Sequence, residues 1–144
     1  MKCVIQRVSR ARVVVEGRTV GEIERGLLLL VGVEKGDPVD VVEAAARKIG
    51  QLRIFSDEDG KMNRSVEDVG GAILAVSQFT LAGSIEKGRR PSFTGAEDPD
   101  RADELFEHFV EILRSDGFRV ETGEFGAMMQ VELVNDGPVT FVYG

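Results

Sequence analysis

The sequence predicts an α+β fold in which a largely antiparallel sheet or partial barrel carries two main helices. Short runs rich in valine, isoleucine, leucine and threonine recur along the chain, and only two segments space their apolar residues as a helix does. Runs of strands with so few helices between them are not typical of a doubly wound parallel sheet. The length, without an internal repeat or a linker, predicts a single domain over residues 1–144.

The strands are predicted where β-branched and other apolar residues cluster between turn residues. The Glu16-Gly17 pair is expected to form a hairpin turn, and Gly70-Gly71 leads into a buried strand that we expect to continue to Leu81. In chain order, the predicted strands are Lys2–Ser9, Arg12–Val15, Arg18–Glu24, Leu27–Glu34, Leu52–Phe55, Ala72–Leu81, Phe118–Thr122, Met128–Asn135 and Pro138–Val142.

Both helices are predicted from the same start signal, an aspartate followed by a proline. Asp37 is expected to cap the first helix and Pro38 to occupy its first position, and Asp98 and Pro99 repeat this arrangement in the second. Gly117 is expected to end the second helix. The apolar residues with helical spacing are Val41, Ala45 and Ile49 in the first helix, and Leu105, Phe106, Phe109, Ile112 and Leu113 in the second.

The composition excludes several classes of protein. A net charge of −7 argues against a protein that coats nucleic acid nonspecifically, although acidic residues dominate only after Pro91, which leaves room for a local basic patch. The longest apolar run, Leu27–Val33, is too short to cross a bilayer, and Arg7 interrupts the start before a signal peptide could form. Cys3 is the only cysteine, so we expect no internal disulfide and a cytoplasmic protein without membrane attachment.

Side chains suited to catalysis are sparse. A zinc site usually needs several Cys or His ligands, and the chain has one of each, so we expect no metal and no cofactor. His108 lies beside the apolar stripe of the second helix, which favours a surface or boundary role, and Cys3 is interpreted as a small core residue. Thr80 lacks a good candidate base, so from the residues alone a strand threonine is favoured over a catalytic one.

Two polar stretches leave their interpretation open. KGRRPSF (Lys87–Phe93) has three cations in four residues beside a proline and an aromatic; it could grip phosphates, or it could be a solvated loop. NDGPVT (Asn135–Thr140) is dense in turn residues and is either a hairpin connection or a rigid turn whose backbone carbonyls serve in recognition.

Taken together, three stretches closely resemble the D-aminoacyl-tRNA deacylase family: SQFTL (Ser77–Leu81), KGRRPSFTGA (Lys87–Ala96) and NDGPVTF (Asn135–Phe141). QRVSRA near the start, and LRIF followed by DGKMN, extend the resemblance in collinear order over the whole chain. The sequence departs from the family pattern at Ala82-Gly83-Ser84 and at Met128, which bears on the shape of the pocket.

The resemblance implies a homodimer that hydrolyses the ester between a D-amino acid and the 3′ end of a tRNA. Because glycine has no side chain that could clash with a site that excludes L-isomers, we also expect glycyl-tRNA to be cleaved. By position, a Gly137-Pro138 cis dipeptide held by Arg7 would enter the partner subunit's site. The other residues carried over are Ser77, Gln78, Phe79 and Thr80 lining the site, and Phe125 and Met129 around the terminal adenosine. If KGRRPSF grips phosphates, the tRNA phosphate contacts would be made by Lys87, Arg89 and Arg90.

Such a site would read the shared backbone of all D-aminoacyl esters and reject the L-isomers. The main-chain N–H groups of Phe79 and Thr80 could bind the developing oxyanion, and a tRNA 2′-hydroxyl could orient the attacking water, which leaves the Thr80 hydroxyl a supporting role. Two alternatives remain: a noncatalytic tRNA-binding module on the same scaffold, and a hydrolase for small D-amino-acid esters. Intact SQFTL and Gly-Pro motifs favour the enzyme over the module.

Overall fold

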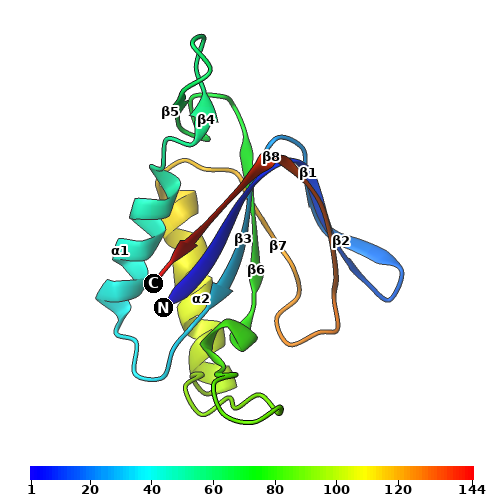
Figure 1. Cartoon of the computed structure of the whole chain (residues 1–144), viewed down its shortest axis with the longest axis vertical. Coiled ribbons are helices and arrows are strands. Elements are labelled where there is room, and N and C mark those ends of the chain that lie inside the picture. The colour runs from blue at the N-terminus through cyan, green and yellow to red at the C-terminus, as the bar shows by residue number, and fades with distance from the viewer.

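A long bent strand, β1, organises the main sheet in the computed structural model, which describes all residues 1–144 (Figure 1). It pairs antiparallel with β2, β3 and β8, whereas β6 runs parallel to β3 and β7 parallel to β6. The elements are β1 (Lys2–Val15), β2 (Arg18–Ile23), β3 (Gly26–Gly32), α1 (Val39–Gly50), β4 (Phe55–Ser56), β5 (Met62–Arg64), β6 (Ala72–Ser77), η1 (Phe79–Ala82, a 3₁₀ helix), α2 (Pro99–Ser115), β7 (Val120–Thr122) and β8 (Gln130–Tyr143).

The main sheet is nearly closed. Its strands follow the order β2-β1-β3-β6-β7, and the two ends of this order approach each other where Gly21 of β2 lies against the Thr122 carbonyl of β7. A Cβ at Gly21 would collide with that carbonyl, so glycine permits the close approach. The prediction of an α+β fold with a partial barrel is confirmed, and the sheet is mixed rather than purely antiparallel.

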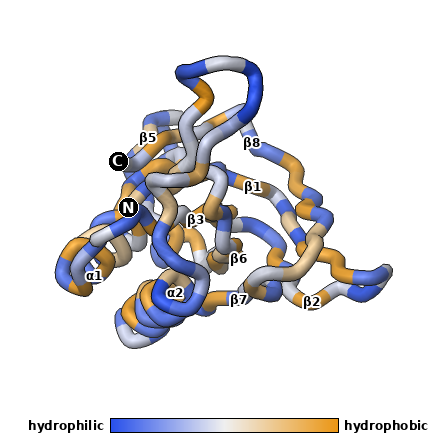
Figure 2. The backbone as a smooth tube through the Cα atoms, turned by 90° about the horizontal axis from the view of Figure 1, so that it is seen from below, coloured by the Kyte–Doolittle hydropathy of each residue, from blue (hydrophilic) through white to orange (hydrophobic).

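The core has one cluster on each face of the sheet. Both helices pack on the same face, where 23 buried residues form the larger cluster (Figure 1). Seen from below, α1 and α2 lie side by side, and orange apolar and blue polar segments alternate along both (Figure 2). Nine buried residues of β1, β2, β3 and β6 form the second cluster, which the partly buried side of β8 helps to cover. No helix is long and apolar enough to cross a membrane.

The predicted start and stop of α2 are confirmed. Asp98 stands at the N-cap with Pro99 after it, and Gly117 follows the helix with a φ of 95°, while the Phe118 N–H bonds back to the Leu113 carbonyl at 3.1 Å. The predicted Glu16-Gly17 turn is also present, with positive φ at both residues, 49° and 75°, as a type I′ hairpin turn requires.

The start of α1 differs from the prediction. Pro38, not Asp37, is the N-cap residue, and the helix begins at Val39. The Asp37 carboxylate is engaged elsewhere: it accepts a hydrogen bond from the Glu34 N–H at 2.8 Å and pairs with the amine of Met1. Burial lowers the pKa of this amine, but its hydrogen bonds to Asp37 and Glu34 outweigh burial and raise it overall.

Several strand boundaries also differ. β1 and β8 are each one strand where the sequence predicts two, because each keeps pairing with the other through local register shifts. β6 ends at Ser77, four residues before the predicted end, and η1 follows. Smaller differences are that β4 begins only at Phe55, that β7 begins at Val120, and that β5, the short antiparallel partner of β4, was not predicted.

Candidate active site

The chain makes a tight turn at the end of β6, where the predicted site residues lie. The Gln78 N–H still bonds to the Val31 carbonyl of β3 at 2.8 Å, as if the strand continued. The first bond of η1 then runs from the Leu81 N–H to the Gln78 carbonyl at 3.2 Å, so the N–H groups of Phe79 and Thr80 have no partner within this helix. Two donors of adjacent residues are therefore available at an exposed turn.

The side chains of this turn contact one another. Gln78 Nε2 donates a hydrogen bond to Thr80 Oγ1 at 2.5 Å, and the Phe79 side chain is 55% exposed. His108 lies elsewhere, between the two helices, where its Nε2 is 2.8 Å from Glu43 Oε1. Thr80 thus has the Gln78 amide as its hydrogen-bond partner, and the histidine that could serve as a base lies between the helices instead.

The basic segment (Lys87–Arg90) is held beside this turn. Two backbone hydrogen bonds between Ser84 and Ser92, 2.7 and 2.9 Å long, close the loop that carries it. Phe93, just after the loop, packs edge-on against Phe79, with ring centroids 5.2 Å apart. The three cations are exposed and form no ion pair within the chain, so they are free to meet a polyanion.

A second predicted group lies at a bend of β8. The register with β1 shifts here, from Thr140 opposite Gln6 to Asn135 opposite Val8, and the Gly137-Pro138 peptide bond within the bend is cis. Arg7 faces the bend: its Nε donates to the Asp136 carbonyl at 2.9 Å, and its Nη1 donates to the Ile54 carbonyl at 2.8 Å. One guanidinium thus joins the bend to the segment that precedes β4.

Asn135 has a role at this bend that was not predicted from the sequence. Its Oδ1 accepts a hydrogen bond from the Val139 N–H at 2.6 Å, and its Nδ2 donates to Thr140 Oγ1 at 2.9 Å. The amide therefore closes the bend across Gly137 and Pro138. The sequence signal for this role is the position of Asn135 at the start of an Asn-Asp-Gly-Pro stretch, because asparagine side chains often bond to the backbone of a turn.

The turn after β6 and the bend of β8 are far apart in one chain. Ser77 pairs with Val31, and Val31 with Cys3, whereas the bend lies opposite Arg7, four positions along β1. At about 3.3 Å per residue and about 4.8 Å per strand, the two segments are on the order of 15–20 Å apart. In Figure 1 the green segment after β6 lies near the bottom of the view, whereas β8 bends beside its label in the upper half.

Phe125 and Met129 lie in the segment that connects β7 to β8. The Gly123 N–H bonds to the Ala75 carbonyl at 3.3 Å, which brings this segment to the last residues of the strand. Phe125 packs on the helical side, where its ring centroid is 6.5 Å from that of Phe106, and Met129 packs on the other cluster. The two residues therefore pack on opposite faces of the sheet.

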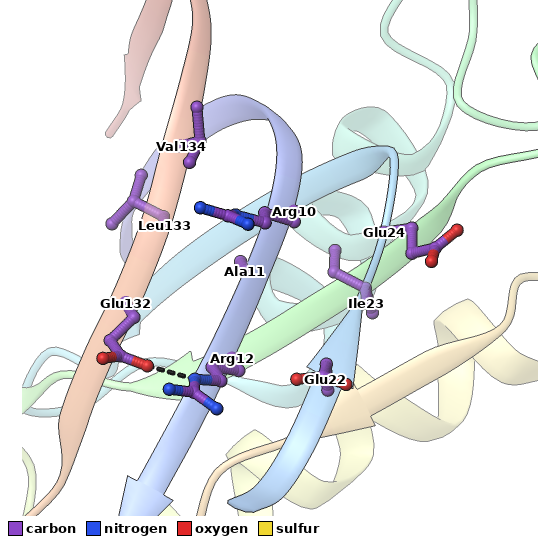
Figure 3. Close-up of a pocket in the computed structure, with 9 residues that line it drawn as sticks. All are labelled: Arg10, Ala11, Arg12, Glu22, Ile23, Glu24, Glu132, Leu133 and Val134. Atoms are coloured by element: carbon purple, nitrogen blue, oxygen red, sulfur yellow. Dashed lines mark hydrogen bonds and ion pairs between the residues drawn. The ribbon is translucent and has the colours of Figure 1, made fainter.

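A hollow of about 480 Å³ lies between β2, β1 and β8 (Figure 3). Charges of both signs face it, and the Arg12 guanidinium pairs with Glu132 and holds the pKa of that carboxyl below its usual range. None of its lining residues was predicted as a site residue. They are Arg10, Ala11, Arg12, Glu22, Ile23, Glu24, Glu132, Leu133 and Val134.

Comparisons with known proteins find similar sequences and similar folds over nearly the whole chain. A family model described as D-Tyr-tRNA(Tyr) deacylase matches residues 4–144. A D-aminoacyl-tRNA deacylase of Koribacter versatilis is 62% identical over 142 residues, 99% of this chain and 95% of the relative. The solved structure of a protein named c-Myc DNA Unwinding Element Binding Protein is 42% identical, with a TM-score of 0.94 over 100% of this chain and 98% of that one. Another solved structure, of a probable eukaryotic D-amino acid tRNA deacylase, is 18% identical and shares the fold, with a TM-score of 0.84 over 99% of this chain and 97% of that one.

The family match and the relatives identify a hydrolytic enzyme of the deacylase class. The chain belongs to the D-Tyr-tRNA(Tyr) deacylase family.

Proposed function

We propose that this protein hydrolyses the ester bond of D-aminoacyl-tRNA in the cytoplasm and rejects the L-isomers, as a proofreading enzyme of translation. The observation that carries the proposal is the turn after β6, where the N–H groups of Phe79 and Thr80 lack helical partners beside an unpaired basic segment. An ester carbonyl can meet the donors while the tRNA backbone meets the cations.

The reaction needs no nucleophile from the chain. Water attacks the ester carbonyl carbon, and the negative charge that develops on the carbonyl oxygen accepts hydrogen bonds from Phe79 and Thr80. Each such donor can contribute about 3–4 kcal/mol. The ester C–O bond then breaks, and the 3′-oxygen of the tRNA leaves with a proton taken from the water. A 2′-hydroxyl of the tRNA would orient the water, since no histidine or carboxylate bonds to Thr80.

The complete site would require two copies of the chain. The Gly137-Pro138 bend cannot reach the turn after β6 within one chain, because the two segments are on the order of 15–20 Å apart. β8 pairs with β1 on one side only, and Val134, Phe141 and Val142 on it are 42%, 43% and 76% exposed. An unpaired edge strand with exposed apolar side chains favours a homodimer in which each bend enters the partner's site.

Backbone groups of the bend would then supply the chiral selection. All D-aminoacyl esters share the arrangement of amine, Cα–H and carbonyl at one carbon, so a rigid backbone can accept many side chains. An L side chain would point into the bend and clash with it. Glycine has no side chain to clash, and glycyl-tRNA is therefore a further substrate.

The test is hydrolysis of one tRNA charged in turn with D-alanine, glycine and L-alanine, beside a simple D-alanyl ester. We expect cleavage of the first two, sparing of L-alanyl-tRNA, and slow or no cleavage of the simple ester. No hydrolysis despite tRNA binding would instead identify a noncatalytic module, and equal rates on the simple ester would identify a small-ester hydrolase. Binding of duplex DNA in place of tRNA would favour the property for which the 42% identical protein is named.

A further inference from the structure

We infer that Phe93 is a positioning residue that couples tRNA contact at the basic segment to the turn carrying the Phe79 and Thr80 N–H groups. The inference rests on the proposed function. It starts from the contact between the two phenylalanine rings, which meet edge to face with an interplanar angle of 62°.

Phe93 is fitted to the turn by the absence of a side chain at Gly83. A Cβ at Gly83 would lie 2.9 Å from both Cδ1 and Cε1 of the Phe93 ring, and 3.0 Å from the Thr80 carbonyl. Gly83 has a φ of −77°, which any residue can adopt, so the glycine provides space rather than an unusual conformation. The ring thus lies over the end of η1, at a position where Gly83 has no side chain that would collide with it.

Phe93 is also tied to the loop that carries the cations. The loop is closed by the Ser84–Ser92 hydrogen bonds, and Phe93 follows Ser92 directly. Beyond it, the Ala96 N–H bonds to the Phe93 carbonyl at 3.1 Å, and the Gly95 carbonyl accepts from the Lys35 N–H at 2.9 Å. A phosphate held by the loop is therefore close in sequence to the ring that braces Phe79.

Binding affinity and the rate of hydrolysis would therefore depend on different residues of this segment. Lys87, Arg89 and Arg90 would set how tightly tRNA binds, whereas Phe93 would set how well the two N–H donors are aimed once tRNA is bound. Small errors in the position of catalytic groups slow a reaction without changing substrate affinity. A substrate without tRNA would not engage the loop, so it would gain nothing from the brace.

The experiment measures the single-turnover rate constant at saturating enzyme and the half-saturating enzyme concentration on D-alanyl-tRNA. We expect Phe93→Ala to lower the rate constant by about tenfold to a hundredfold while the half-saturating concentration stays within about threefold. Phe93→Tyr, which keeps the ring, should restore most of the rate. Ile85→Ala is the matched control, because Ile85 is an apolar residue of the same loop that is 81% exposed.

If Phe93→Ala folds poorly, a double-mutant cycle between Gly83 and Phe93 tests the same coupling. Gly83→Ala should slow the reaction in the wild-type background, because the new Cβ displaces the ring, and should have a smaller effect once Phe93 is alanine or leucine. Additive effects, an unchanged rate constant, or parallel losses of rate, binding and melting temperature would overturn the inference. Absence of hydrolysis by the wild-type protein would instead overturn the proposed function.

Discussion

The guanidinium of Arg7 donates a 2.9 Å hydrogen bond to the backbone carbonyl of Asp136, 129 residues further along the chain. A side chain near the middle of β1 thus fixes the bend of β8, and the same group reaches the Ile54 carbonyl. The proposed chiral selection depends on the shape of this bend, and Arg7 holds its backbone.

Gly137→Ala should damage that selection. Gly137 has a φ of 143°, and an added Cβ would lie 2.8 Å from Val139 Cγ2 and 3.1 Å from Arg7 Nη2, so the bend must shift. We expect D-alanyl-tRNA hydrolysis to fall by about a hundredfold, and the preference for D- over L-alanyl-tRNA to shrink in the residual activity. Gly17→Ala is the control: its φ of 75° is also positive, but nothing lies within 4 Å of the added Cβ. A Gly137→Ala variant with wild-type rate and selectivity would contradict the role of the bend.

Replacing Lys87, Arg89 and Arg90 together with alanine should weaken tRNA binding and flatten its salt dependence. The slope of log K against log salt concentration is negative, and each lost phosphate contact reduces its magnitude by roughly 0.7–0.9. The magnitude of the slope should therefore decrease by about 2–3. The preference for D- over L-substrates should not change. Lys48→Ala, an exposed cation on α1, serves as the control. An unchanged slope would show that the segment is a solvated loop.

Thr80→Ala should retain substantial deacylation, within about tenfold of wild type, because the backbone N–H of residue 80 survives the change. The hydroxyl bonds only to Gln78 Nε2, which can bond to water at this exposed position. Thr80→Ser distinguishes a supporting role of the hydroxyl from a role as the nucleophile. If serine is active and alanine is inert in a protein that folds and binds tRNA, the hydroxyl is the nucleophile after all.

Cys3 should resist alkylation in the native protein. Burial raises the pKa of its thiol to about 12, so the reactive thiolate is scarce at a pH of about 8.5 and the group is enclosed. The same shift links stability to pH: the folded state holds the proton between pH 9 and 12 while the unfolded state loses it. The free energy of unfolding should therefore fall more steeply with pH in this window than for Cys3→Ala, by up to about 1.4 kcal/mol per pH unit. Equal slopes would contradict the burial of the thiol.

Local signals predicted the elements that depend on local chemistry. The turn at Glu16-Gly17 and the two ends of α2 follow from residues whose backbone preferences act over three or four positions. The same reasoning failed where pairing with a distant strand decides the outcome. Asn-Asp-Gly-Pro predicts the end of a strand, yet β8 continues past it because β1 pairs with β8 on both sides of the bend.

The candidate site residues could be named from the sequence, but their arrangement in space could not. β-branched and aromatic residues at Phe79 and Thr80 suggest a continuing strand, but the chain forms a 3₁₀ turn there, packed against Gly32 of β3. The contact of Phe79 with Phe93 joins segments with no shared periodicity. Nor could the sequence show that the Gly137-Pro138 bend is held away from this turn within one chain.

The central claim is that each active site combines the turn of one chain with the bend of another. It is tested by mixing two inactive variants, Gly137→Ala and Thr80→Pro, the second lacking one of the two N–H donors. In a heterodimer one site receives both intact parts, so random exchange should restore about a quarter of the wild-type rate on D-alanyl-tRNA. No recovery, although mass spectrometry shows that subunits have exchanged, would contradict the shared site.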